Sequence, residues 1–296
     1  MSAAVLQSLP SGAADAARLA ARLGLNLHVI AVHRFPDGEL RVTAGEPATT
    51  VILYAPLDRP NDKLLALLFA AEALRRGGAR RLVLVAPYLC YMRQDTAFNP
   101  GEAISQKVVG ELIARTVDRV VTVDAHLHRT KSIRDVFPGI EAEDLSAMGP
   151  IAAALGGIAR DTVVVGPDEE SQAWVSDLAG RLSLAAAVAR KTRGGDRSVQ
   201  IAFPDPALFN GRPVLLVDDI VSSGGTLVAC AKALAAAGAR TIDAITTHAL
   251  FTPEMVDDFK RAGIGSIRST TSVPHPTNAI ALDDILASAL RKEAGA

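Results

Sequence analysis

The sequence predicts an α/β protein in which helices cover both faces of mainly parallel β-sheets. Short runs rich in valine, isoleucine and leucine alternate along the chain with alanine- and leucine-rich stretches of helical spacing. The strand-like runs are apolar throughout, which is typical of strands that are buried on both faces. In addition, one strand–helix–strand pattern occurs twice, once in each half of the chain. Together these observations predict doubly wound sheets in a duplicated arrangement.

The alternation of strands and helices can be followed from residue 51 onward. The predicted strands are residues 51–54, 81–86, 119–123, 162–165, 214–217 and 241–246. Amphipathic spacing predicts helices over residues 62–76, 105–115, 171–181 and 226–237. A helix between two strands is the kind of connection that parallel pairing requires, so these segments predict parallel sheets.

Length and composition limit the classes of protein to which the chain can belong. It has 296 residues, enough for two domains, and 49% of them are hydrophobic, which excludes disorder as the main state. The net charge of −1 argues against a general affinity for nucleic acid or for anionic membranes. The longest apolar run, residues 64–71, is far shorter than the roughly 20 residues of a membrane span, and residues 1–10 show no signal peptide. There are only two cysteines, both in apolar contexts, so we expect a cytoplasmic protein. From the charge balance and the short apolar runs we expect no nucleic-acid or membrane partner.

The internal repeat places the two copies of the pattern in different halves of the chain. Residues 73–82 recur as residues 233–242, and each copy is the end of a helix, a glycine cap and the start of a strand. An apolar strand precedes each helix, over residues 51–54 in the first copy and 214–217 in the second. The two copies differ in the loop that follows this strand, so a single sugar-phosphate site would belong to the second copy.

The loop of the second copy carries the residues that point most clearly to chemistry. Asp218 and Asp219 follow an apolar strand, at the edge of an open α/β sheet where ligands bind. Next come two hydroxyl residues, two glycines and a threonine that opens a helix: Ser222, Ser223, Gly224, Gly225 and Thr226. Glycine lets the backbone approach a ligand closely, and the N–H groups at a helix N-terminus bind anions. The pattern therefore predicts a ribose 5-phosphate site, with the phosphate in the loop and the sugar hydroxyls on the two carboxylates.

This loop resembles the phosphoribosyl pyrophosphate (PRPP) fingerprint of type I phosphoribosyltransferases and ribose-phosphate pyrophosphokinases. The remaining motifs resemble the pyrophosphokinase over almost the whole chain. The resemblance implies two duplicated type I phosphoribosyltransferase-like domains, each a doubly wound, mainly parallel sheet flanked by helices. We expect an N-terminal domain over residues 1–147 and a C-terminal domain over residues 148–296, with the terminal helix able to pack back on the first domain.

The resemblance also implies the residues that bind ATP. In the segment 35–42, which resembles the family's N-terminal signature, Phe35 would contact adenine, and Asp37, Gly38 and Glu39 would meet the nucleotide's polar groups. In the family this segment reaches the ATP site of a neighbouring subunit, which implies a homo-oligomer, a dimer or a hexamer. The segment 87–95 likewise resembles a family motif and implies that Arg93 and Gln94 bind ATP.

Two further segments imply the metal site and the transition-state contacts. Asp124, His126 and His128 alternate at the end of a strand, so we expect them to share one strand face. The resemblance implies Mg²⁺ near His126 and Asp168, although Glu169 and Glu170 replace the small residues that are common in the family. The basic segment 190–199 resembles the family's flexible loop, which implies that Lys191 and Arg193 contact the transferring group, with Arg193 also at the ribose 5-phosphate site.

The implied reaction is the transfer of diphosphate from MgATP to the C1 hydroxyl of ribose 5-phosphate, which gives PRPP and AMP. Alignment of the reacting groups and neutralisation of phosphate charge would supply most of the rate, and no general base is assigned. Two alternatives stay open. A type I phosphoribosyltransferase would consume PRPP and release pyrophosphate, whereas a non-catalytic regulatory homologue would form no AMP.

Overall fold

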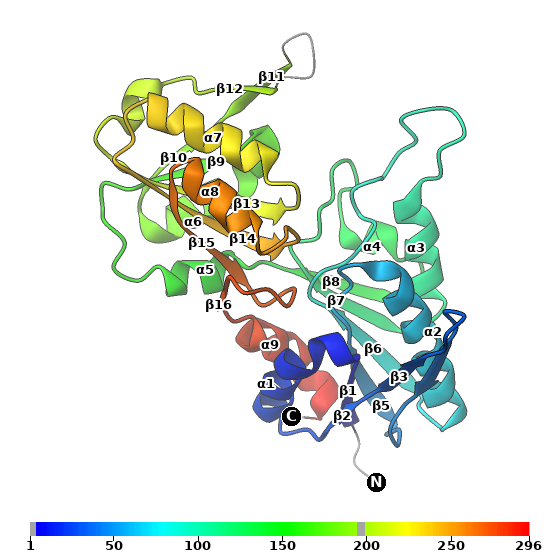
Figure 1. Ribbon diagram of the computed structural model, residues 1–296. Helices are drawn as coiled ribbons and strands as arrows, with labels where there is room; N and C mark the ends of the chain where they lie inside the picture. Colours follow the sequence, from blue (N-terminus) through cyan, green and yellow to red (C-terminus); the bar gives the residue numbers. More distant parts are fainter. Residues whose placement is uncertain (1–3, 194–198, 296) are drawn as a thin grey trace. The chain divides into compact units, whose positions relative to one another are not determined.

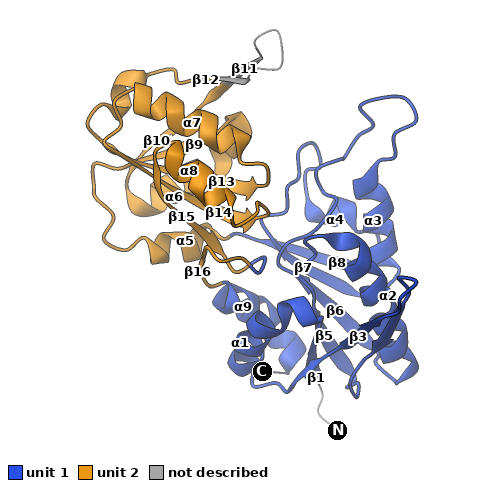
Figure 2. Ribbon diagram, viewed as in Figure 1, with its two compact units in different colours: residues 1–146, 272–274, 282–296 blue, residues 147–271, 275–281 orange. Residues whose placement is uncertain are grey.

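The computed structural model describes residues 4–193 and 199–295, and of residues 191–193, 199 and 200 the backbone alone. The chain divides into two compact units (Figure 2). Unit 1 comprises residues 1–146, 272–274 and 282–296, and unit 2 comprises residues 147–271 and 275–281. The C-terminal helix therefore belongs to unit 1, although most of the second half of the chain forms unit 2.

Unit 1 is built on a six-stranded parallel sheet with the order β2-β1-β5-β6-β7-β8 (Figure 1). Its strands are β1 (Ala4–Ser8), β2 (Leu27–Val29), β5 (Thr50–Tyr54), β6 (Arg81–Ala86), β7 (Arg119–Val123) and β8 (Glu141–Leu145). Its helices are α1 (Ala13–Leu23), α2 (Pro60–Arg76), α3 (Ser105–Ala114), α4 (Ile133–Val136) and α9 (Asp283–Ala294). Between β2 and β5 the chain forms a separate antiparallel hairpin of β3 (Ala31–Arg34) and β4 (Leu40–Thr43).

Unit 2 repeats this plan with the parallel order β10-β9-β13-β14-β15-β16. Its strands are β9 (Val163–Gly166), β10 (Ala185–Val188), β13 (Pro213–Val221), β14 (Thr241–Ala249), β15 (Ile264–Thr270) and β16 (Asn278–Ile280). Its helices are α5 (Met148–Ala154), α6 (Gln172–Leu182), α7 (Gly225–Ala236) and α8 (Met255–Arg261). A second antiparallel hairpin, β11 (Arg190–Arg193) with β12 (Val199–Ala202), lies between β10 and β13 in the chain.

The predicted fold class is confirmed in both units. The side chains of β6 from Leu82 to Ala86 are completely buried, and so are those of β9 from Val163 to Val165, as expected for strands covered on both faces. Right-handed crossovers place α2 and α3 on one face of the first sheet and α1 on the other. In the second sheet the same rule places α6 on one face and α7 and α8 on the other.

Two strands of unit 2 are longer than the sequence predicts. The apolar runs end at Val217 and Thr246, but β13 continues to Val221 and β14 to Ala249, because the two strands pair in register along their whole length. The backbone ladder thus extends past the point at which the side chains become polar. As a result, Asp218 and Asp219 lie within a strand rather than in the loop that follows it.

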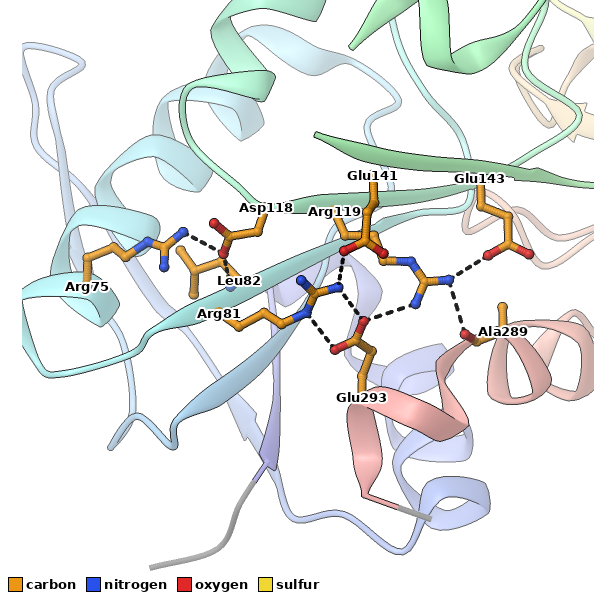
Figure 3. Close-up of polar contacts among 9 residues, drawn as sticks. All are labelled: Arg75, Arg81, Leu82, Asp118, Arg119, Glu141, Glu143, Ala289 and Glu293. Atoms are coloured by element: carbon orange, nitrogen blue, oxygen red, sulfur yellow. Dashed lines mark hydrogen bonds and ion pairs between the residues drawn. The ribbon is translucent and has the colours of Figure 1, made fainter. Parts of the chain in front are cut away.

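A buried carboxylate attaches the C-terminal helix to unit 1 (Figure 3). The Glu293 side chain on α9 is only 8% exposed and accepts hydrogen bonds from Arg81 at 2.7 and 2.8 Å and from Arg119 at 3.1 Å. These arginines begin β6 and β7, at the amino edge of the sheet. Arg119 also donates to the Ala289 carbonyl at 3.2 Å. Hydrogen bonds from Arg81, and then from Arg119, lower the pKa of Glu293 against the opposing effect of burial.

Candidate active site

The acidic pair of unit 2 lies at the carboxyl end of the central strand β13. Asp219 is 4% exposed and Asp218 is half-buried. Each carboxylate accepts a hydrogen bond from the N–H of the next residue, Asp218 from Asp219 at 3.1 Å and Asp219 from Ile220 at 2.8 Å. These local bonds hold both carboxylates in position before any ligand is present.

A third carboxylate adds to the negative charge at this edge of the sheet. Burial, followed by the carboxylates of Asp219 and Asp168, raises the pKa of Asp218 well above its usual range. Asp168 follows β9, the strand that pairs with β13. Clustered carboxylate oxygens are the hard donors that a divalent cation such as Mg²⁺ prefers, so the donor set fits such an ion. Unit 2 therefore brings three of the predicted acidic residues together.

The loop between β13 and α7 presents hydrogen-bond donors to solvent. Ser222, Ser223 and Gly225 are exposed, and Thr226 is half-buried. No described side chain caps the N-terminus of α7, and the first N–H groups of a helix have no acceptor within the helix. The five predicted residues from Ser222 to Thr226 thus form an open donor site that suits an anion.

Side chains of α8 pack against this loop and support it. Gly224 has φ +65°, and a Cβ atom built there would lie 2.5 Å from Phe259 and 2.8 Å from Met255. Phe259 is 1% exposed and stacks edge-on against Phe251, with ring centroids 5.1 Å apart. Sequence analysis missed Phe259 and Met255, because they lie on another helix and belong to no motif. Gly224 is required here for close packing as well as for its left-handed backbone.

The hairpin of β3 and β4 carries the predicted adenine contact. The Phe35 ring is 37% exposed, with the His33 ring edge-on at 4.7 Å and the Arg41 guanidinium 5.9 Å from its centroid. Glu39 donates its N–H to the Asp37 carboxylate at 3.1 Å, and Gly38 donates to the Phe35 carbonyl at 2.9 Å. One oxygen of the Asp37 carboxylate therefore stabilises the turn, whereas the Phe35 ring remains accessible to a ligand.

The second predicted ATP segment follows β6. Arg93 is exposed and has no ion pair among the described residues, so its guanidinium is available to an anion. Gln94 accepts a hydrogen bond from the Ser105 hydroxyl at 2.9 Å. Asp95 pairs with Arg129, whose N–H donates at 2.8 Å and whose guanidinium donates at 2.7 Å. Burial alone would raise the pKa of Asp95, but these bonds from Arg129 lower it.

The histidines lie in a strained turn rather than on a strand face, so that prediction was wrong. β7 ends at Val123, and Asp124 has φ +41°, which breaks the strand alternation. The turn brings His126 and His128 together all the same, with their Nε2 atoms 2.9 Å apart. It is braced by Asp144 on β8, whose carboxylate oxygens accept the Ala125 N–H at 3.0 and 3.2 Å. Asp144 could not be predicted from the sequence, because its contact joins β8 to the turn that follows β7.

The remaining predicted residues are described to different depths. Asp168 lies in unit 2, in the turn before α6, whereas His126 lies in unit 1. The backbone of Lys191 and Arg193 forms part of β11, but their side chains lie outside the described residues. Residues 194–198 of the basic segment also lie outside them.

Comparison with known proteins identifies the family. One family model, described as the N-terminal domain of ribose phosphate pyrophosphokinase, matches residues 5–116, and a phosphoribosyl transferase domain model matches residues 149–273. A ribose-phosphate pyrophosphokinase of Methanopyrus kandleri is 32% identical over 94% of this chain and 95% of its own. One of Granulibacter bethesdensis is 34% identical over 86% of this chain and 83% of its own.

A solved structure supports the fold. The crystal structure of phosphoribosylpyrophosphate synthetase from Mycobacterium smegmatis matches with a TM-score of 0.83 and 24% identity, and the match covers 97% of both chains. The match to the Methanopyrus kandleri relative covers nearly the full length of both chains, so the similarity is not confined to one domain. The chain therefore belongs to the ribose-phosphate pyrophosphokinase family of enzymes.

Proposed function

We propose that this chain transfers diphosphate from MgATP to the C1 hydroxyl of ribose 5-phosphate. The C1 oxygen forms a bond to the β-phosphorus, the bond between that phosphorus and the oxygen bridging to the α-phosphorus breaks, and AMP leaves with that oxygen. The C1 hydroxyl loses its proton, and no general base is assigned. The observation that carries this proposal is the donor loop that follows the acidic pair at the carboxyl end of β13.

The end of β13 and the loop that follows it would bind different parts of ribose 5-phosphate. The N–H and hydroxyl donors of Ser222, Ser223, Gly224, Gly225 and Thr226 would hold the 5-phosphate. The carboxylates of Asp218 and Asp219 would accept hydrogen bonds from ribose hydroxyls. Because both carboxylates are already held by backbone N–H groups, little ordering is needed when the sugar binds.

ATP would be bound by residues of unit 1. Phe35 offers an accessible ring for the adenine, and Asp37, Gly38 and Glu39 offer polar groups for the rest of the nucleoside. Arg93 offers an exposed cation for the phosphates, beside Gln94. Lys191 and Arg193 of the β11–β12 hairpin would neutralise charge on the transferring group, and Arg193 would also contact ribose 5-phosphate.

Mg²⁺ is the proposed cofactor, and the family resemblance assigns it to His126 and Asp168. When bound, it would neutralise charge on the triphosphate. The acidic residues of unit 2 would suit such an ion, because the carboxylates of Asp219 and Asp168 lie close enough to Asp218 to raise its pKa, and carboxylate oxygens are ligands that Mg²⁺ prefers. Asp144 would act as a positioning residue for the His126 turn through the Ala125 N–H.

We propose a homo-oligomer, a dimer or a hexamer. Four large apolar side chains in unit 1 are exposed at helical spacing, Leu65 and Phe69 on α2 and Val108 and Leu112 on α3. Both helices cover the same face of the sheet, so these side chains suit an interface with a second copy.

The proposed location is the cytoplasm, because both cysteines are buried thiols rather than a disulfide. Burial raises the pKa of Cys90 and of Cys230 to about 12. Among the described residues, no helix is long and apolar enough to cross a membrane.

A coupled assay tests the proposed reaction. The purified chain is supplied with ATP, Mg²⁺ and ribose 5-phosphate, and AMP and PRPP are measured. We expect the two products in equal amounts and only when all three components are present. Pyrophosphate release from PRPP and a nucleobase, without AMP formation from ATP, would instead identify a phosphoribosyltransferase. Formation of neither product would identify a non-catalytic homologue.

A further inference from the structure

Unit 2 contains a cavity at the end of the sheet opposite the proposed active site. It has a volume of about 340 Å³ and is lined by the end of α5, the turn that follows it, and the first residues of β13. Thr162, Asp243 on β14 and Arg268 on β15 also line it. Because β13 runs from this cavity toward the Ser222–Thr226 loop, the two sites lie about 20 Å apart along the strand. The cavity is therefore separate from the residues proposed to bind ribose 5-phosphate.

Arg268 places a guanidinium in this cavity that has no partner among the described residues. Arg268 is half-buried on an internal strand of a parallel sheet, a position that apolar side chains usually occupy. Its guanidinium has no ion pair and no hydrogen bond among the described residues. A partly buried guanidinium with five donors recognises carboxylate and phosphate groups through paired hydrogen bonds.

The neighbouring carboxylate does not neutralise this cation. Asp243 is the register partner of Ser266, and Arg268 follows two residues later on β15, so all three side chains leave the same face of the sheet. The Asp243 carboxylate accepts a hydrogen bond from the Ser266 hydroxyl at 2.5 Å and forms no ion pair with Arg268 among the described residues. The Arg268 guanidinium is thus available to bind an anion, and the Asp243 carboxylate is available to bind a hydroxyl or an ammonium group.

A buried hydroxyl without a partner lies in the wall of the same cavity. Thr162 is 2% exposed, and its Oγ1 is one of two buried side-chain polar atoms without a hydrogen-bond partner in the described part of the chain. A buried polar group without a partner is destabilising, so folded proteins rarely leave one unsatisfied. A polar ligand atom in the cavity can supply the partner after rotation of the threonine side chain.

From these observations we propose that the cavity is a binding site for a small anion that also carries hydroxyl or amino groups. The anionic group, a carboxylate or a phosphate, binds Arg268 with Thr162 nearby, and the hydroxyl or amino groups bind Asp243. The volume equals that of about ten water molecules, which suits a small metabolite rather than a complete nucleotide.

Calorimetric titration of the full-length chain tests this proposal with two probes. Gluconate supplies a carboxylate with hydroxyls, and glycerol 3-phosphate supplies a phosphate with hydroxyls, so the two arms distinguish the anionic groups. We expect at least one probe to bind the wild-type chain and to bind Arg268→Gln at least about tenfold more weakly. Ala154→Trp, which places a large side chain at an exposed position in the lining, should weaken binding similarly without disturbing the core.

Arg261→Gln is the matched control. It removes an equally charged but highly exposed arginine of unit 2, on α8 and away from the cavity lining, and should leave binding unchanged. The proposal is overturned if neither probe binds at up to about 10 mM, or if Arg268→Gln and Arg261→Gln have equal effects. It is also overturned if Arg268→Gln changes only the oligomeric mass, because Arg268 would then belong to an interface between copies.

Discussion

The two units share one plan, and they differ where one strand passes into one helix. In each sheet the third strand of the order is followed directly by a helix, β5 by α2 in unit 1 and β13 by α7 in unit 2. In unit 1 this joint is closed by its own side chains, because Leu57 is completely buried and Lys63 donates to Asp58 and to the Pro56 carbonyl. Pro60 also removes an N–H group from the first turn of α2.

The corresponding joint of unit 2 has the opposite character. Its carboxylates are clustered, its two serines are exposed, and the N-terminus of α7 has no side-chain cap. The duplicated fold thus supplies the same scaffold twice, and the proposed sugar-phosphate site depends on loop residues that only the second copy carries.

The hairpins of the two units correspond in the same way. Along the chain, each hairpin lies between the strands that are first and third in the sheet order, β3–β4 between β2 and β5 and β11–β12 between β10 and β13. The first carries the accessible Phe35 ring and the second carries Lys191 and Arg193. We therefore interpret both hairpins as ligand-contacting additions to a common core, one suited to adenine and the other to phosphate charge.

The largest effect is expected from removing the cations of the second hairpin. Lys191→Ala combined with Arg193→Ala should lower kcat by about 10³ or more with the fold intact, because the charge of the transferring group would lose its partners. Steady-state assays of AMP formation and circular dichroism measure the two quantities. Arg190→Ala is the control, since Arg190 is 69% exposed on the same strand and should matter little. Unchanged kcat in the double variant would remove the hairpin from the mechanism.

A smaller but still large effect is expected at the acidic pair. Asp218→Asn combined with Asp219→Asn should raise the KM for ribose 5-phosphate about 50- to 100-fold, because strong acceptors for the sugar hydroxyls are lost. Asp58→Asn makes the corresponding change in the joint of unit 1 and should leave this KM unchanged. Equal effects of the two changes would contradict the assignment of the sugar to unit 2.

The support beneath the loop should give a moderate effect. Phe259→Leu should raise the KM for ribose 5-phosphate about five- to tenfold, because the surface against which Gly224 packs is lost. Phe209→Leu changes an equally buried phenylalanine of the same unit and should cost similar stability, about 1–2 kcal/mol, without this change in KM. If both variants changed KM equally, Phe259 would have no specific positioning role.

The smallest effect on catalysis is expected at the amino edge of unit 1, at the opposite end of its sheet from the β5–α2 joint. Glu293→Gln should lower the free energy of unfolding by about 2 kcal/mol near pH 7, since charged hydrogen bonds to Arg81 and Arg119 are weakened. Because the pKa of Glu293 is lowered in the folded chain, its contribution is complete above about pH 5 and is lost as the pH falls through that lowered pKa. Denaturant unfolding from pH 3 to pH 7 should therefore show the two chains converging at low pH. A difference that did not depend on pH would contradict this ionic role.

Much of the fold could be predicted from the sequence because it depends on local patterns. The apolar runs that became β5, β6, β7 and β9 report burial on both faces directly, and the glycine after each repeated helix marks its end. The true ends of β13 and β14 could not be predicted, because pairing between the two strands extends the ladder beyond their apolar residues.

The candidate site could be predicted only where its functional residues lie close together in the sequence. Residues 218–226 carry their pattern within one segment and could be found from it. Phe259 and Asp144 act across the fold, on Gly224 and on the Ala125 N–H, and no local pattern reveals such contacts. The strand face expected for His126 and His128 failed for a related reason, since the turn at Asp124 depends on hydrogen bonds to β8.

The most direct test of the central claim is a crystal structure of the chain with bound ribose 5-phosphate. We predict that the 5-phosphate lies on the N–H and hydroxyl groups of Ser222–Thr226 and that the ribose hydroxyls contact Asp218 and Asp219. A phosphate bound instead at the Ala55–Lys63 joint of unit 1, or a loop in unit 2 that stays empty at saturating ligand, would contradict the account.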